Sequence, residues 1–182
     1  MKPELKMTIL LVCGAMIWGT IFFVGCSANN PKKRAKALAE KALFESVANP
    51  ESVTVKAVSE PDSVFGREYV TDEEQMAIAI AMVNINKKVM ADTQDLSNLD
   101  LSNQETTELM ERQMSAMSAM SVLRSLAAPH KPGEPKPPFN GWKVKIEYEA
   151  LSANGNPYHS EYWFILNNDA ECVINSFEIP LL

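Results

Sequence analysis

The stretch WKVKIEYEA at residues 142–150 decides the fold, because its apolar and charged side chains strictly alternate. A period of two is typical of a β-strand that buries one face. Turn signals at 154–155 and 167–169 separate this strand from two more, at 158–166 and 172–179, and the three predict a C-terminal antiparallel meander. The buried face is expected to carry Trp142, Val144, Ile146, Tyr148 and Ala150, and the charged outer face Lys143, Lys145, Glu147 and Glu149.

Upstream of the meander, the sequence predicts one helix and two short strands. Asn30-Pro31 begins a helix that is expected to run to about Ala48, and Asn49-Pro50 ends it. Residues 53–58 and 63–70 carry β-branched and aromatic side chains on either side of a turn at 60–62, which predicts a short β-hairpin. The apolar stripe of the helix is expected to be Ala35, Leu38 and Ala42, with Phe44 as a further member.

Two long helices are predicted between the hairpin and the meander. Thr71 and Glu74 have the spacing of a capping box and open a helix at 72–91, whose broad apolar face is expected to be deeply buried or to pack against a partner. A second capping box at 102–105 opens a helix that runs to about Ala127. Its inward side chains are expected to be Leu109, Met110, Met114, Met117, Met120, Leu123 and Leu126.

Five prolines in residues 128–138 predict a stiff connector between the second long helix and the meander. The alternative is a polyproline II edge that serves as a ligand for an aromatic groove. Residues 31–182 are therefore predicted to form one α+β domain with an N-terminal helix, a short β-hairpin, two long packed helices and a three-stranded antiparallel meander. The helices are expected to cover one face of a single sheet.

The first thirty residues predict a location. Met7 to Gly25 contains no charged residue, and Lys2 and Lys6 precede it, which is the layout of a secretory signal. A run of nineteen uncharged, mostly apolar residues is also long enough to cross a bilayer, so an uncleaved single-pass membrane anchor is the alternative.

The apolar run ends in FVGCS, residues 23–27, which resembles the lipobox of bacterial lipoproteins, with Phe23 in place of the preferred Leu. The resemblance implies that residues 1–25 are removed as a signal peptide, that Cys26 receives a covalent lipid, and that residues 26–30 form a lipidated tether. Acyl chains of this kind hold a domain at a membrane surface. Cys172 follows a turn and opens an apolar strand, so it is expected to be a small core residue.

Two further stretches resemble small uncharacterised lipoproteins of outer-membrane-bearing bacteria. These are NPESV at residues 49–53, followed by a strand, and GWKVKIEYEALSANG at 141–155, followed by YWFILNND at 162–169. The resemblance covers about sixty residues, and its motifs imply a fold without implying a catalytic residue. Acidic residues are missing directly after Cys26, which by the same resemblance favours a domain that faces the periplasm.

Few residues have the spacing that catalysis needs. His130 and His159 stand outside any HExxH or comparable metal motif, and the sequence contains no Gly-rich phosphate loop and no GxSxG elbow. His159 and Glu161 share a strand face and come closest to a proton-transfer pair, although a solvated surface pair is favoured. The net charge of −6 provides no basic field for nucleic acid. The sequence predicts a non-enzymatic protein.

Met114, Met117 and Met120 form an MxxMxxM run that resembles the methionine motifs of extracytoplasmic copper proteins, where thioethers bind Cu(I). The core of an amphipathic helix carries the same stripe, and that interpretation is favoured, with no cofactor expected beyond the lipid. Extracytoplasmic Cu(I) binding through these three residues is the alternative function.

The sequence thus predicts a membrane-tethered lipoprotein that acts as a binding or structural module in the cell envelope. Its expected partners are membrane lipid, through Cys26, and an envelope protein. The candidate contact surface is the polyproline edge or the outer face of the meander, which carries Lys143, Lys145, His159 and Trp163.

Overall fold

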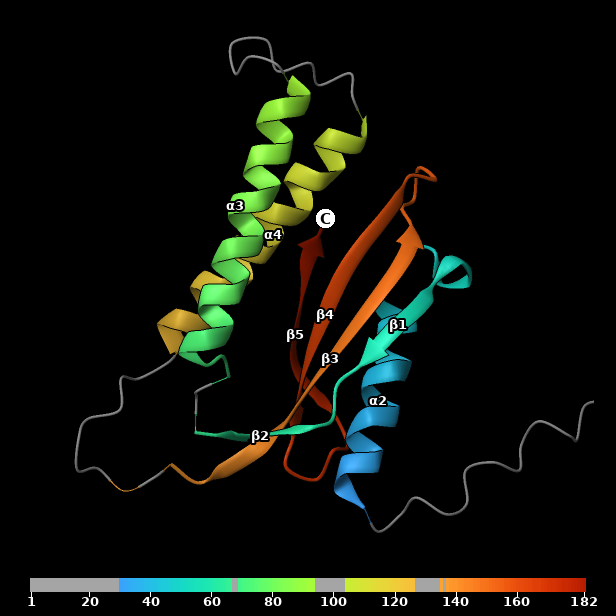
Figure 1. Ribbon diagram of the computed structural model, residues 1–182. Coiled ribbons are helices and arrows are strands. Elements are labelled where there is room, and N and C mark those ends of the chain that lie inside the picture. The colour runs from blue at the N-terminus through green and yellow to red at the C-terminus, as the bar shows by residue number, and fades with distance from the viewer. Residues whose placement is uncertain (1–29, 67–68, 94–103, 127–134, 136) are drawn as a thin grey trace, which may run out of the picture. The chain divides into compact units, whose positions relative to one another are not determined.

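Strand β3, Phe139–Leu151, contains the alternating stretch and lies at the centre of one antiparallel sheet. It pairs with β4, Pro157–Asn167, which in turn pairs with β5, Val173–Leu181, so the predicted C-terminal meander is confirmed (Figure 1). Gly155 has a φ of 85° in the β3–β4 turn, a backbone conformation that glycine adopts without steric cost.

The computed structural model describes residues 30–66, 69–93, 104–126, 135 and 137–182, and Pro31–Leu182 form one compact unit. The predicted signal peptide, tether and lipidated Cys26 lie outside the described residues. The same holds for residues 96–103 and for most of the proline-rich segment at 128–138. No described helix has the length and apolar character that a membrane span requires.

Two short strands, β1 (Thr54–Val58) and β2 (Asp62–Phe65), occur near the predicted positions. Both pair antiparallel with β3 and lie one after the other along its free edge, so the expected hairpin is opened out into an interrupted edge strand. Ser59 explains the difference. Its backbone N–H donates to the Lys145 carbonyl oxygen at 2.9 Å and its Oγ accepts from the Lys145 N–H at 3.0 Å, which keeps the chain on β3 between the two strands.

Helix α2, Pro31–Ser46, begins at the predicted proline and ends two residues earlier than expected. It packs on the face of the sheet that carries Trp142, Val144, Ile146 and Tyr148. The buried stripe of α2 is Ala35, Ala39, Ala42 and Leu43, whereas Phe44 is 45% exposed, so its predicted place in the stripe is wrong. Positions i, i+4, i+7 and i+8 share one helical face, and the alanines allow the helix to approach the sheet closely.

Helices α3, Asp72–Thr93, and α4, Gln104–Leu126, pack together and lie against β4 and β5 (Figure 1). They cover the face opposite α2, since Phe164 packs with α2 while its neighbour Trp163 packs with Ile78 of α3. The expectation that helices cover only one face is therefore wrong. Trp163, Phe177 and Ile179 make the second face apolar on β4 and β5, even though β3 is charged there.

The capping box at the start of α3 is confirmed. The Thr71 N–H donates to Glu74 Oε2 at 2.9 Å, and the Glu74 N–H donates to Thr71 Oγ1 at 3.2 Å. These two bonds satisfy backbone donors that the first turn of a helix leaves without partners. The second predicted capping box depends on Ser102 and Asn103, which lie outside the described residues.

Cys172 is exposed, so its predicted role as a core residue is wrong. The β4–β5 turn buries Ala170 instead, with a φ of 53°. Asn167 Oδ1 accepts hydrogen bonds from the N–H groups of Glu171 at 2.7 Å and Cys172 at 3.1 Å. The turn is thus closed by hydrogen bonds to its own Asn167 side chain, and β5 begins directly after it.

Candidate functional site

Lys143, Lys145 and Trp163, predicted to form an outer contact surface, lie beneath α3 around Glu74. Lys143 Nζ lies 2.6 Å from both carboxylate oxygens of Glu74, and Lys145 Nζ lies 2.6 Å from Oε1. The exposed fractions of the three charged side chains are 6% for Lys143, 22% for Lys145 and 14% for Glu74. The two ammonium groups also lie 5.3 and 4.3 Å from the centre of the Trp163 ring. We call these four residues the Glu74 cluster.

The Glu74 cluster joins the start of α3 to the sheet. Lys143 and Lys145 are two positions apart on β3 and therefore point to the same face, while Trp163 is the β4 partner of Lys145. Burial alone would raise the pKa of Glu74, but hydrogen bonds from Lys143, Lys145 and the Thr71 N–H together lower it below its usual value. The cluster is a structural link, because its charged groups are directed at one another.

His159 does not meet Glu161, the partner considered in the sequence. Its Nε2 lies 2.9 Å from Glu147 Oε1 on the neighbouring strand, whereas Glu161 accepts a hydrogen bond from the Trp163 indole N–H. The His159 side chain is 30% exposed. The structure thus does not bring His159 and Glu161 together. Glu147 faces Glu161 directly across the two strands and lies diagonal to His159, within reach of its long side chain.

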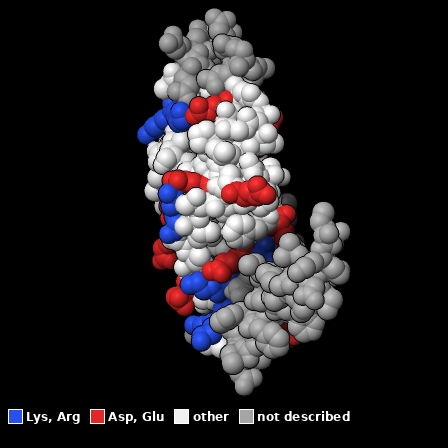
Figure 2. All heavy atoms as spheres, turned by 90° about the vertical axis from the view of Figure 1, so that its right-hand side faces the viewer, with Lys and Arg blue, Asp and Glu red and all other residues white. Residues whose placement is uncertain are grey.

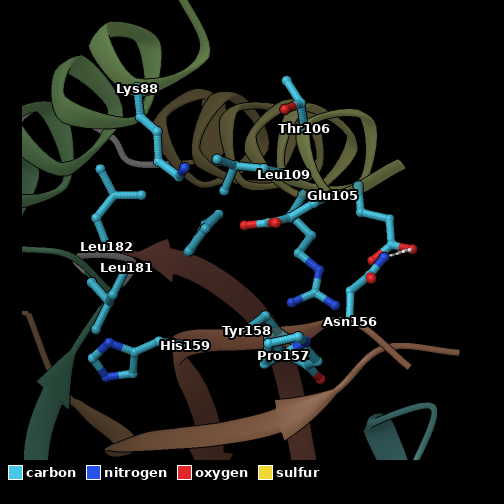
Figure 3. Close-up of a pocket in the computed structure, with 13 residues that line it drawn as sticks. Lys88, Glu105, Thr106, Leu109, Asn156, Pro157, Tyr158, His159, Leu181 and Leu182 are labelled. Atoms are coloured by element: carbon cyan, nitrogen blue, oxygen red, sulfur yellow. Dashed lines mark hydrogen bonds between the residues drawn. The ribbon is translucent and has the colours of Figure 1, made fainter. Parts of the chain in front are cut away.

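A cavity of about 180 Å³ lies between α4 and the ends of β4 and β5 (Figure 3). Arg112 extends from α4 over the Tyr158 ring, with its guanidinium carbon 3.2 Å from the ring centre and Nη1 3.6 Å from Glu178 Oε1. Lys88 of α3 approaches from above with Leu182 close to it, and Leu181 and His159 lie below them (Figure 3). Sites for whole small molecules measure roughly 300–1,000 Å³, so this cavity fits a single side chain.

Several polar groups around this cavity hold α4 to the sheet. Glu108 Oε1 accepts hydrogen bonds from the side-chain amides of Asn154 at 2.7 Å and Asn156 at 3.2 Å, which lowers the pKa of Glu108.

Two tyrosines near these contacts have raised pKa values. Burial, followed by the nearby charge of Glu178, raises the pKa of Tyr148 far above its usual value. Burial also raises the pKa of Tyr158. Both phenols therefore remain neutral, and neither acts as a base near neutral pH.

Several large apolar side chains are exposed on the side of α3 and α4 that points away from the sheet. We call it the outer helical face and define it by six side chains that are 50–63% exposed: Met76, Ile80, Val83, Met90, Met114 and Met117. On α3, the buried Ile85 lies nine positions after Met76, which is about 180° around the helix. The broad apolar face predicted for this helix is thus divided between the sheet and the surface.

The predicted inward positions of Met114 and Met117 are wrong. Among the α4 side chains that the structure describes, Thr106, Gln113 and Ala116 are buried, and Gln113 Nε2 donates to Asn86 Oδ1 of α3 at 2.7 Å. Apolar residues are spread around α4, so their periodicity selects no face, and the amide bond to α3 together with the Arg112 contact orients the helix. The side chains of Leu123 and Leu126 lie outside the described residues.

A groove of about 330 Å³ runs between α3 and α4, and three thioethers line it: Met82, Met117 and Met120. Met114, the remaining member of the MxxMxxM run, is 61% exposed. Among the described residues, His, Cys, Asp and Glu form no group of three or more that could hold a metal ion. Thioether ligation is a separate chemistry, and Cu(I) binding by the methionines stays a prediction.

On the face drawn in Figure 2, the Lys and Arg side chains of the described residues alternate with Asp and Glu and form no continuous basic patch. Comparisons of the chain with models of protein families, with curated proteins and with solved structures found no match. The function is therefore inferred from the chemistry of the chain's own surfaces.

Replacement of Glu74 by Gln is expected to destabilise the fold by roughly 3 kcal/mol, because two lysines on the sheet lose their buried counter-charge. Chemical denaturation at neutral pH measures the change. The matched control is Glu73→Gln, which removes the neighbouring exposed carboxylate and is expected to change the free energy of unfolding by less than about 0.5 kcal/mol. Equal effects of the two substitutions would show that the Glu74 cluster does not stabilise the fold.

The same cluster predicts a pH dependence. A carboxylate whose pKa is lowered by folding contributes stability above its unfolded pKa, near 4.5, and this contribution is lost as the pH falls through the lower folded value. Acid titration of unfolding should therefore show a smaller loss of stability below pH 4.5 for Glu74→Gln than for the wild type. Parallel curves for the two proteins would contradict the lowered pKa.

Proposed function

We propose that this chain is a lipid-anchored protein of the bacterial cell envelope that acts as a non-enzymatic protein-binding module through its outer helical face. The observation that carries the proposal is the exposure of six large apolar side chains together on α3 and α4. Contiguous apolar surface of this kind is typical of interaction sites in soluble domains. Four of the six are methionines, whose flexible thioethers adapt well to a partner surface.

A binding module accounts for the remaining features better than an enzyme does. Two ionisable groups that line the cavity take part in contacts that hold the layers together: Arg112 with Tyr158, and Glu108 with the β3–β4 turn. The cavity of about 180 Å³ suits one anchoring side chain of a protein ligand. These observations support recognition of a macromolecular surface.

The anchor is proposed from the sequence. The lipobox-like FVGCS places the lipid on Cys26, four residues before Asn30, so the tether that follows the lipid is short. Lys32, Lys33, Arg34 and Lys36 follow within ten residues. Basic side chains near an anionic leaflet contribute about 1 kcal/mol each. Such a tether keeps the domain close to the periplasmic side of a membrane.

Inhibition of the lipoprotein signal peptidase is expected to leave a precursor that is heavier by residues 1–25, because cleavage would normally precede Cys26. Mass spectrometry of the protein from membrane fractions measures the difference. Cys26→Ser should prevent lipidation and abolish the effect of the inhibitor. An unchanged mass with and without the inhibitor would contradict the lipid anchor and favour the single-pass membrane anchor.

A photoreactive side chain at Met114 is expected to form covalent adducts with protein in intact cells, because that position lies on the outer helical face. The matched control is the same side chain at Glu45, which is also exposed but lies on α2. Adducts are detected as mass shifts on denaturing gels and identified by mass spectrometry. Adducts of equal yield at both positions would contradict the assignment of the binding surface.

A further inference from the structure

The α3 side of the outer helical face has the spacing of a coiled-coil seam. Its seam positions alternate by three and four residues along the helix, and all six side chains are exposed: Glu73, Met76, Ile80, Val83, Lys87 and Met90. Alternation of this kind, with an average spacing of 3.5 residues, keeps a stripe in contact with a partner helix when the two helices wind around each other. A surface helix that only covers a sheet needs no such regularity on its outward side.

The charges along this seam select the direction of a partner helix. Glu73 lies in the first turn of α3, and Lys87 lies four turns later. An antiparallel second copy of α3 would set Ile80 against Val83 at the centre, followed by Met76 against Lys87 and Glu73 against Met90. Glu73 then lies within one turn of Lys87 of the second copy. A parallel copy would place each charge beside its own duplicate, which is unfavourable.

Helix α4 extends the same surface. Met110, Met114, Met117 and Ser121 are spaced by four, three and four residues, and Met114 and Met117 are 61% and 57% exposed. The apolar stripes of α3 and α4 both lie on the outer helical face. Two such pairs brought together by a two-fold axis have the layout of an antiparallel four-helix bundle.

We propose that a second copy of this chain occupies the outer helical face, by antiparallel pairing of α3 with α3 across a two-fold axis. The inference rests on the proposed function, since it names the partner of the same surface. It explains why the seam has apolar residues at its centre and opposite charges toward its ends. The same surface patch serves both copies, as closed two-fold interfaces require.

Charge reversal tests the pairing directly. The processed protein is purified from membranes, and its mass is measured by sedimentation equilibrium in a density-matched detergent. The wild type is expected to reach the mass of two copies. Glu73→Lys and Lys87→Glu should each weaken the dimer about tenfold, because two attractive contacts become two repulsive ones. The double variant with both reversals should return to within about threefold of the wild type.

Two further variants separate pairing from folding. Ile80→Asp places a charge at the centre of the seam and is expected to abolish the dimer, whereas Glu45→Lys on α2 should leave it unchanged. Circular dichroism that matches the wild type verifies that each variant is folded. A double variant that stays as weak as the single reversals would overturn the antiparallel register.

The outcome also distinguishes this inference from the proposed function. A wild-type monomer at all concentrations overturns self-pairing, and the binding module stands if photoreactive Met114 still captures a different protein. A monomer that captures no protein overturns both. A monomer whose outer helical face inserts into phosphatidylglycerol vesicles, as reported by a fluorophore at position 114, overturns self-pairing in favour of a lipid surface.

Discussion

The contact on which the rest of the structure depends is that between Glu74 and the two lysines of β3. Glu74 belongs both to the capping box that begins α3 and to the buried charge cluster on the sheet, so one carboxylate sets where the helix starts and where it lies. The Lys143 side chain is 6% exposed, and leaving a charge this buried without its partner is strongly unfavourable. The cluster therefore permits few alternative placements of α3 on this face.

This placement determines which side of α3 is available for binding. With Glu74, Ile78 and Ile85 directed at the rest of the domain, the seam that includes Met76, Ile80 and Val83 is left on the outside. The Gln113–Asn86 bond sets α4 beside α3, with Met114 and Met117 on the same outer side. The Glu74 cluster, at the start of α3, thus determines that the outer helical face is exposed. The proposed function depends on that face.

The helices and strands of the fold could be predicted because each is specified by residues close together in the sequence. The alternation at 142–150 defines a strand, and Thr71 with Glu74 defines a helix start, without reference to the rest of the chain. What covers a face is a long-range property. Alternation correctly placed Lys143 and Lys145 on one face of β3, but it contained no sign that α3 would bring a carboxylate to that face. The predicted contact surface at Lys143, Lys145 and Trp163 is therefore covered by α3, and the exposed apolar surface lies on α3 and α4.

The sequence predicts Met114 and Met117 to point inward, because a methionine stripe is ordinary in a core. Their exposure depends on polar contacts of Gln113 and Arg112 that a hydrophobic pattern does not contain.

Hydrogen–deuterium exchange of the α3 backbone amides, compared between the wild type, Glu74→Gln and Glu73→Gln under native conditions, shows whether the Glu74 cluster holds α3 on the sheet. If the Glu74 cluster holds α3 on the sheet, the amides of α3 should exchange faster in Glu74→Gln, while those of β3 and β4 keep their protection and Glu73→Gln resembles the wild type. Unchanged protection of α3 in Glu74→Gln would show that the Glu74 cluster does not hold α3 on the sheet.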